Sequence, residues 1–252
     1  LSHANLLAAG RYISSGHDVA HKDVALCVLP IYHINGLCVT VMGTLASAST
    51  LVIPHRFSVS AFWRLIETHR CSWFSAVPTQ YSYILHNKDM PGKISCLRFA
   101  RSASAPLSPE IHRKFEERFK VPIIETMGLT ETGSQISTNP LPPQTRKIGS
   151  PGKAYGNKLM IGNNAGDEME RGITGEILVK GDNVMKGYFK QPDETANTIN
   201  ENGWLKTGDL GYMDEDGYIF VTGRIKELII KGGENIAPRE IDEALLDHES
   251  VL

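Results

Sequence analysis

The chain has 252 residues, of which 41% are hydrophobic and 21% charged, with a formal net charge of −2. A chain of this length and apolar fraction can bury a substantial core, as one large or two smaller domains. Acidic and basic residues are intermixed and no basic run is long enough for a nucleic-acid footprint, so no polynucleotide partner is expected. No apolar run approaches the roughly 18 residues of a spanning helix, so no membrane span is expected either.

The four cysteines, Cys27, Cys38, Cys71 and Cys96, lie among apolar segments without a CxxC pair. We interpret them as small buried hydrophobic residues, not as a metal site or a disulfide framework. This usage fits a reducing compartment, and a cytoplasmic location is expected. The chain begins at Leu1 instead of Met and stops just after a helical pattern has begun, so we interpret it as an internal piece of a longer protein.

Short apolar, β-branched runs alternate with helical patterns in the first half of the chain, which is typical of an α/β fold. Strands are expected over residues 24–29, 50–53, 73–76, 97–101 and 121–125, and helices over 37–48, 59–69 and 109–119. The last helix is opened by Ser108 as a cap and Pro109 as its first residue. The last strand leads into a turn at Gly128, so the residues beyond it are expected where open α/β sheets bind ligands.

After about residue 150 the sequence pattern changes. Short strands separated by glycines are expected over 158–161, 176–180 and 218–222. This pattern predicts a small antiparallel β subdomain. From Pro238 onward, acidic residues in a first helical turn predict the start of a further helix.

Thr130 and Glu131 follow the glycine-containing run Glu125-Thr126-Met127-Gly128-Leu129. A hydroxyl beside a carboxylate suits a site where Thr contacts phosphate oxygens and Glu holds Mg2+. The alternative is a strand-to-helix turn in which Thr caps the helix and Glu complements its dipole. The residues alone leave both interpretations open.

Asp209, in the run Thr207-Gly208-Asp209, could accept hydrogen bonds from both hydroxyls of a ribose, and Arg224 adds a planar donor fork for ribose or phosphate oxygen. The alternatives are a tight turn at Gly208 and a surface Arg at a strand end. Lys231-Gly232-Gly233 is either a loop that lets a ligand approach the backbone or a hairpin turn.

Three histidines are candidate ligands. His33 lies where the first strand gives way to a helix, and there an imidazole could face a carboxylate substrate, although a lone His is more often structural. His17 and His21 have the i, i+4 spacing of a metal pair, but no third ligand is evident and no zinc site is expected.

Taken together and in order, these segments resemble the adenylate-forming (AMP-binding) superfamily of acyl-CoA synthetases, firefly luciferases and peptide-synthetase adenylation domains. The run 101–107 looks like the family's small-residue segment, and Lys186-Gly187-Tyr188 and 223–227 look like acyl-CoA ligase versions of later motifs. The resemblance implies a large N-terminal domain with an α/β part over 1–157 and a β subdomain over 158–225. Residues 226–252 would then be the hinge and the truncated start of the C-terminal lid domain.

The resemblance also implies an acyl-CoA synthetase of the fatty-acyl- or oxalate-CoA ligase branch, which uses ATP, Mg2+ and coenzyme A on a small-molecule carboxylate. The implied ligands are Ser102, Ala103 and Ser104 beside the adenine, Glu125, Thr126, Met127 and Gly128 in the turn, Thr130 and Glu131 for phosphate and Mg2+, Asp209 and Arg224 at the ribose, and Lys231, Gly232 and Gly233 near the pantetheine tunnel. Lys226 matches the family's hinge, and His33 matches the His at the mouth of the acyl pocket, with Tyr32, Ala105 and Ile136 expected in the pocket wall.

The chain departs from the family pattern in several places. The phosphate loop that normally precedes Leu1 and the late C-terminal Lys are absent, so the fragment is expected to catalyse neither half-reaction alone. The usual aromatic residue before Leu129 is Met127, which offers a thioether contact in place of base stacking. The His of the oxalate enzymes is replaced by Ser134, so oxalate is not assigned as substrate. Two alternatives stay open: an adenylation domain that loads a carrier protein, and a non-catalytic nucleotide-binding module.

Overall fold

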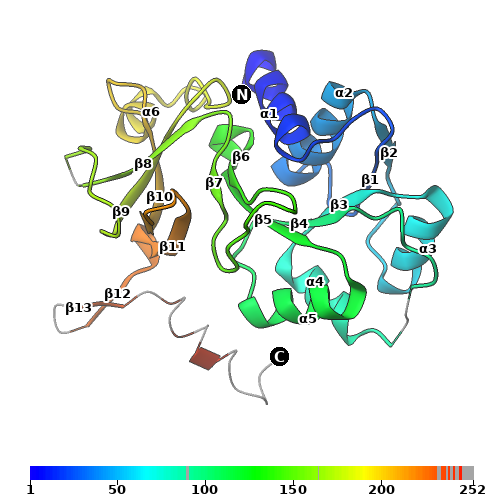
Figure 1. Cartoon of the computed structure of the whole chain (residues 1–252). Helices are drawn as coiled ribbons and strands as arrows, with labels where there is room; N and C mark the ends of the chain where they lie inside the picture. Colours follow the sequence, from blue (N-terminus) through cyan, green and yellow to red (C-terminus); the bar gives the residue numbers. More distant parts are fainter. Residues whose placement is uncertain are drawn as a thin grey trace. The chain divides into compact units, whose positions relative to one another are not determined.

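The computed structural model describes residues 1–88, 91–163, 165–231 and 234–236, and the single residues Pro238, Ile241, Ala244 and Leu245. It divides into two compact units (Figure 1). The first unit comprises Leu1–Gly156 with Asp182–Met185, and the second comprises Asn157–Gly181 with Lys186–Leu252. The short segment Asp182–Met185 lies in the sequence between two parts of the second unit but packs with the first unit. No sequence pattern indicated this.

A seven-stranded sheet forms the centre of the first unit, in the order β2-β1-β3-β4-β5-β6-β7. Its parallel part consists of β1 (Val24–Cys27), β2 (Thr50–Val52), β3 (Trp73–Ala76), β4 (Phe99–Ser102) and β5 (Ile123–Leu129). The sheet continues with the antiparallel strands β6 (Ser134–Thr138) and β7 (Lys153–Ala154). Every residue of β3 and β4 is buried, as expected for parallel strands covered on both faces, although β4 includes the polar residues Arg101 and Ser102.

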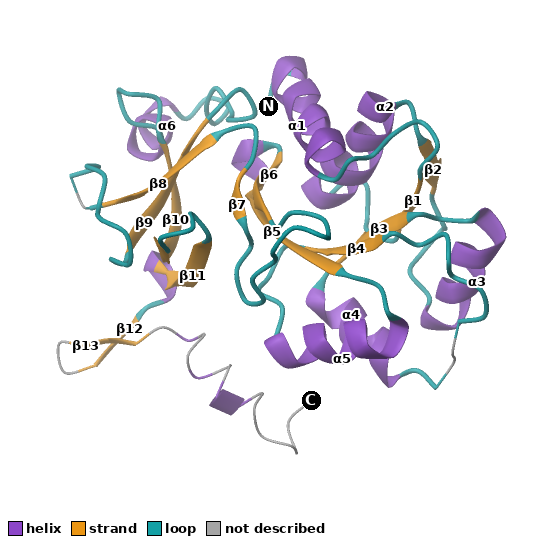
Figure 2. Cartoon of the chain, viewed as in Figure 1, coloured by secondary structure: helices purple, strands orange, loops and turns teal. Residues whose placement is uncertain are grey.

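Helices cover both faces of this sheet (Figure 2). One face carries α1 (His3–Gly16), the π-helix η1 (Asn35–Met42) and α2 (Gly43–Ser47), and the other carries α3 (Val59–His69), α4 (Pro78–His86) and α5 (Pro109–Phe119). Neighbouring strand residues point to opposite faces, so Phe74 packs with the α3–α5 side and Trp73 with the α1–η1 side. Two apolar clusters therefore sandwich one sheet.

Several helices and strands were not expected from the sequence. The helix expected over 37–48 is divided into η1 and α2, and α1, α4, β6 and β7 were not predicted. The buried face of α1 consists of Asn5, Ala9, Gly10 and Ile13, which gives no strong apolar stripe. Close packing explains these small residues, because a Cβ on Gly10 would lie 2.7 Å from the carbonyl oxygen of Met42 in η1.

The second unit contains a four-stranded antiparallel sheet in the order β11-β10-β9-β8, as the glycine-punctuated pattern predicted. Its elements are β8 (Lys158–Gly162), β9 (Gly175–Lys180), α6 (Pro192–Thr198), β10 (Leu205–Met213), β11 (Ile219–Arg224), the 3-10 turn η3 (Ile225–Glu227), and the paired strands β12 (Ile229–Lys231) and β13 (Glu234–Ile236). The pairing of β12 with β13 supports the hairpin interpretation of the segment around Lys231. The helix expected from Pro238 falls largely outside the described residues.

Two expectations about the whole chain concern its thiols and its helices. Cys27, Cys38 and Cys71 are buried free thiols, and Cys96 is half-buried. None of the described helices combines the length and the apolar character that crossing a bilayer would require.

Candidate functional site

The strand β5 ends in a 3-10 turn, η2 (Thr130–Thr132), after which the chain reverses into β6. The Thr132 hydroxyl holds this turn, because it accepts from the Leu129 amide at 3.2 Å and lies 2.8 Å from the carbonyl oxygen of Ser134. The segment is a three-residue turn followed by a strand, not the helix that the capping alternative requires. Thr130 therefore begins a tight reversal at the carboxyl end of a parallel-sheet strand.

Backbone packing fixes the shape of this reversal. A Cβ on Gly128 would lie 1.9 Å from the carbonyl oxygen of Ser134, so only glycine fits there. Ser134 itself has a φ of +96°, a strained conformation for a residue with a side chain. The result leaves Gly128 and Thr130 exposed and Glu131 half-buried.

The segment Asp182–Met185, which belongs to the first unit, forms hydrogen bonds to the turn at Thr130–Thr132. The Met185 amide donates to the carbonyl oxygen of Glu131 at 2.7 Å. The Asn183 side chain is buried and donates to the Thr132 carbonyl at 2.8 Å. Asn183 could not be found from the sequence, because it lies 51 residues from Thr132 and belongs to no motif that spacing could reveal.

Thr130 and Glu131 are suited to a metal that arrives with a nucleotide. Among the described residues, no group of three or more His, Cys, Asp and Glu side chains is placed to hold a metal ion. Mg2+ needs no such cage, because it keeps several waters and takes one or two carboxylates plus phosphate oxygens. One half-buried carboxylate next to an exposed hydroxyl fits that requirement.

The end of β4 lies beside the end of β5. The Thr126 hydroxyl donates to the carbonyl oxygen of Ser102 at 3.3 Å, and the Ala103 amide donates to the carbonyl of Ala76. Ser102 and Ala103 are buried, whereas Ser104 is exposed and has a φ of +76°. A strained non-glycine residue at the end of a parallel strand is typical of a ligand site.

His33 lies in the loop between β1 and η1, and its ring is exposed. The Asn35 amide donates to its Nδ1 at 3.2 Å, which orients the imidazole. The Asn35 side chain donates in turn to the Ser104 hydroxyl at 3.1 Å. The structure thus brings the His33 loop and the 102–104 segment together, as a shared pocket wall would require.

Glu125 is placed differently from the other predicted ligands. Its carboxylate is buried, lies 2.9 Å from His112 Nδ1 and accepts from the Gly149 amide. The other ring nitrogen of His112 lies 3.0 Å from Glu116. Burial alone would lower the pKa of His112, but the hydrogen bonds to Glu116 and Glu125 outweigh it and raise that pKa. The Glu125 side chain is therefore engaged inside the fold, and a nucleotide role for this residue stays a prediction.

In the second unit, Asp209 on β10 pairs with Arg224 on β11, with 2.7 Å between Oδ1 and Nε. The Asp209 side chain is only 11% exposed, against 52% for Arg224. Burial raises the pKa of Asp209, while the Arg224 guanidinium acts against that rise. Within the described part of the chain, Oδ2 of Asp209 has no hydrogen-bond partner, so it is available to a ligand hydroxyl.

Four further predicted residues lie along the chain that follows β11. Lys226 is exposed in η3, and Lys231 is exposed in β12. Gly232 and Gly233 lie outside the described residues. Their roles at the hinge and at the coenzyme A thiol stay predictions.

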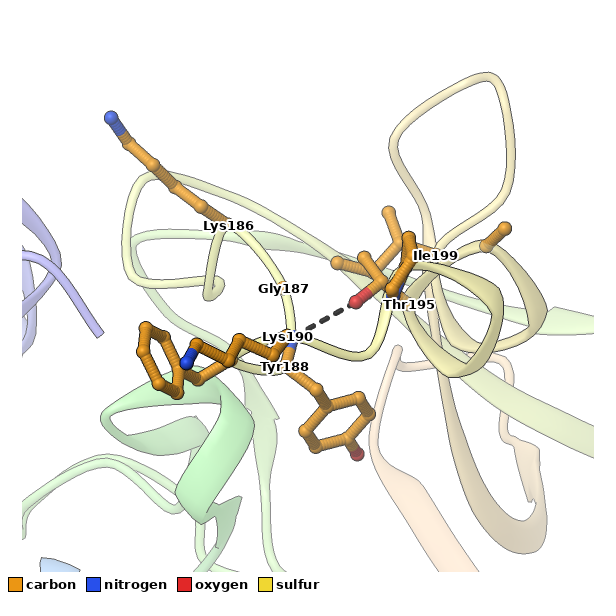
Figure 3. Close-up of a pocket in the computed structure, with 9 residues that line it drawn as sticks. Lys186, Gly187, Tyr188, Lys190, Thr195 and Ile199 are labelled. Atoms are coloured by element: carbon orange, nitrogen blue, oxygen red, sulfur yellow. Dashed lines mark hydrogen bonds between the residues drawn. The ribbon is translucent and has the colours of Figure 1, made fainter.

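The Lys186-Gly187-Tyr188 motif borders a hollow of about 540 Å³ in the second unit (Figure 3). The Tyr188 amide donates to the Thr195 hydroxyl at 2.9 Å, and a Cβ on Gly187 would lie 2.7 Å from Thr195. Phe189 is 86% exposed. The glycine of this motif thus serves the packing of its loop against α6, and none of the predicted nucleotide ligands lines the hollow.

A nucleotide-dependent enzyme of the adenylate-forming class fits this architecture, in which one unit carries a hydroxyl and a carboxylate beyond a parallel strand and the other an acid–arginine pair. Residues 1–189 match the family described as AMP-binding enzyme, and the chain belongs to that family.

Relatives and solved structures agree with this assignment. The sulfoacetate–CoA ligase of Cupriavidus necator is 50% identical over 253 residues, with 100% of the chain and 49% of the relative covered. The oxalate–CoA ligase of Arabidopsis thaliana is 38% identical, with 100% and 50% covered. ATP-bound MatB from Rhodopseudomonas palustris matches with a TM-score of 0.91 at 34% identity, covering 98% of the chain and 49% of that structure.

O-succinylbenzoate coenzyme A synthetase (MenE) from Bacillus subtilis, in complex with ATP and magnesium, matches with a TM-score of 0.89 at 33% identity. That match covers 100% of the chain and 52% of the structure. The chain spans about half the length of the curated relatives it matches. The family resemblance and the fold class expected from the sequence are both confirmed.

Proposed function

We propose that the whole protein is an AMP-forming acyl-CoA synthetase, located in the cytoplasm, and that this chain supplies most of its nucleotide site. The observation that carries the proposal is the turn at Thr130 and Glu131. It presents a hydroxyl and a carboxylate at the carboxyl end of β5, supported from behind by Asn183. The CoA ligases among the relatives support the reaction class.

In the first step, a carboxylate oxygen of the acid attacks the α-phosphorus of ATP, and the bond to the β-phosphate breaks to release pyrophosphate. The Thr130 hydroxyl donates a hydrogen bond to a phosphate oxygen, and the Glu131 carboxylate is the ligand for Mg2+. A cation held there would supply charge neutralisation at the phosphates. Asp209 accepts from the ribose through Oδ2, while Arg224 holds the carboxylate still. Catalysis here is positioning with charge neutralisation.

In the second step, the thiol of coenzyme A attacks the acyl carbon and AMP leaves. Lys226 lies in a three-residue 3-10 turn between β11 and β12. We assign it to the hinge that exchanges the two steps, because short exposed links absorb such rotations. Lys231, with Gly232 and Gly233, is assigned to the approach of the thiol.

The acid is a small-molecule carboxylate. The relatives are named for sulfoacetate and oxalate, which are short acids with two acidic groups. The fatty-acyl branch expected from the motifs is the competing class, and a panel of acids separates the two.

The test is acid-dependent ATP–pyrophosphate exchange by the full-length protein. The panel runs from acetate, oxalate and sulfoacetate through other short dicarboxylates and benzoates to long fatty acids. Exchange with one acid class, followed by thioester formation with free coenzyme A, is the expected result. Glu131→Gln should abolish most of this exchange, whereas Glu117→Gln, an exposed carboxylate on α5, should not.

Two results would overturn the proposal. A protein that is stabilised by ATP by about RT ln(1 + [L]/Kd) yet exchanges with no acid is a nucleotide-binding module. Acyl transfer to a carrier protein but not to free coenzyme A would identify a carrier-loading adenylation domain.

A further inference from the structure

Arg101 on β4 is wholly buried and has no carboxylate partner among the described residues. One terminal nitrogen donates to Asn35 Oδ1 and to the Ser75 hydroxyl, each at 3.1 Å. The other donates to Gln135 Oε1 at 3.3 Å, and the buried Nε has no partner. A permanent positive charge is therefore surrounded by neutral groups, with one N–H donor unsatisfied.

Burying a charge without a counter-charge is costly, and proteins normally pair such a group. The same fold does so three residues earlier, where Arg98 NH1 lies 2.7 Å from both carboxylate oxygens of Asp23. Burial lowers the pKa of Arg101 to about 9, which still leaves the guanidinium protonated at neutral pH. A purely structural role would be met at lower cost by a neutral side chain.

The neutral partners of Arg101 connect it to the site. Asn35 also donates to Ser104 and lies two residues after His33, so it joins the two segments of the expected acyl-pocket wall. Gln135 is reached directly after the turn that carries Thr130 and Glu131.

His17 completes the network without adding charge. Its Nε2 lies 3.0 Å from Gln135 Oε1, and burial, with the nearby Arg101, lowers the pKa of His17 to about 3. His17 is therefore neutral at physiological pH. The guanidinium is the charged group of this network within the described residues.

We propose that Arg101 determines the acid specificity of this site: it favours a short carboxylic acid that carries a second anionic group, carboxylate or sulfonate, over an uncharged acyl chain. This inference rests on the proposed acyl-CoA synthetase function. An anion in the pocket supplies the counter-charge that the fold omits, and the low local dielectric strengthens the attraction. An apolar chain would instead meet a polar network whose central charge stays uncompensated.

The test compares kcat/KM of the full-length protein for doubly acidic and singly acidic substrates of equal carbon number. Arg101→Gln should lower the preference for the doubly acidic substrate about 10- to 100-fold, the range expected for losing a hydrogen bond to a charged group. Arg101→Lys keeps the charge and should restore part of the preference. Arg98→Gln breaks a partly buried ion pair just before the same strand and should reduce stability without changing the preference.

Asn35→Asp provides a second variant that keeps the size of the side chain and the oxygen facing Arg101. It places a counter-charge beside the guanidinium, so the preference should fall; the Oδ1 contacts to Arg101 and Ser75 are kept, and the Ser104 hydroxyl can donate to the new carboxylate in place of accepting from Asn35. If Arg101→Gln does not fold, the substrate preference of Asn35→Asp tests the inference in its place.

An unchanged preference in the folded variants would overturn the inference. So would a wild-type protein that uses singly acidic substrates better, although the proposed function would then survive. Failure to exchange with any acid would remove the proposed function as well.

Discussion

Asp209 and Arg224 face each other across neighbouring antiparallel strands, as register partners whose side chains meet at 2.7 Å. The two residues are 15 positions apart along the chain, which runs out along β10, turns at Asp214–Gly217 and returns along β11. Arg224 donates through Nε to one oxygen of Asp209 and leaves the other for a ligand. Such a carboxylate is held in place before any nucleotide binds, which lowers the cost of binding.

Asp209→Ala in the full-length protein should therefore raise the KM for ATP about 10- to 100-fold, as expected for losing hydrogen bonds to a charged acceptor. Steady-state kinetics with varied ATP measures this effect. Asp193→Ala removes an exposed acid in the first turn of α6 and should leave the KM unchanged. Unaltered ATP dependence in Asp209→Ala would remove the ribose assignment.

Lys226→Ala should slow thioester formation more than adenylation, by about tenfold or 1.4 kcal/mol of barrier, because the residue lies in the proposed hinge. Pyrophosphate exchange measures the first step, and acyl-CoA production from preformed acyl-adenylate measures the second. Lys206→Ala, an exposed lysine on β10, is the matched control. Equal losses in both steps would contradict the hinge role.

Local sequence patterns were sufficient to predict the bounds of an element where burial or a capping residue decides its structure. The strand at Trp73–Ala76 and the helix Pro109–Phe119 were expected with those bounds, since the first is wholly buried and the second has a Ser108 cap and a proline start. The strand β10 was missed because Gly208, with a φ of +74°, looks like a turn residue yet forms an irregularity inside a long strand.

The candidate site could be predicted from the sequence where its residues stand in short motifs. Thr130 and Glu131 are adjacent along the chain, so their common turn could be anticipated. Asn183 and the partners of Arg101 come from distant segments, and only the folded sheet brings them there. The inward direction of the Glu125 side chain depends on which residues of β5 face each side of the sheet. The strand expected over 121–125 did not by itself predict those faces.

Gly128→Ala should destabilise the first unit by about 1–3 kcal/mol, the usual cost of forcing a group into a packed position. The added Cβ would meet the Ser134 carbonyl oxygen at 1.9 Å, and backbone cannot move aside as a side chain can. Urea unfolding followed by circular dichroism measures the loss. Gly172→Ala has open space and carries only the strain of its φ of +79°, so it should cost less. A similar loss in both variants would show that the clash at Gly128 is relieved.

His112→Gln should destabilise the protein by about 1–3 kcal/mol near pH 6, because it leaves the buried Glu125 carboxylate without its imidazolium partner. The pKa of His112 is raised from 6.5. Its contribution to the free energy of unfolding is therefore complete below pH 6.5 and is lost as the pH rises through the raised value.

Glu116 acts in the opposite direction. Burial alone would raise its pKa, but hydrogen bonds from His112, Arg146 and the Ile123 amide outweigh it and lower the pKa from 4.5 to about 2. Its stabilising contribution is present above pH 4.5 and is lost as the pH falls towards 2. The cluster of His112, Glu116 and Glu125 should therefore stabilise the fold most above pH 4.5 and below pH 6.5.

The measurement is the urea unfolding free energy of the wild type, His112→Gln and His86→Gln from about pH 5 to about pH 9. Wild type should lose stability as the pH rises above 6.5, and His112→Gln should lack that part of the slope. His86 is exposed on α4, so His86→Gln should follow the wild-type curve. A parallel pH dependence of wild type and His112→Gln would mean that His112 is neutral in the fold, and the cluster would then owe its stability to Glu116 and Arg146 alone.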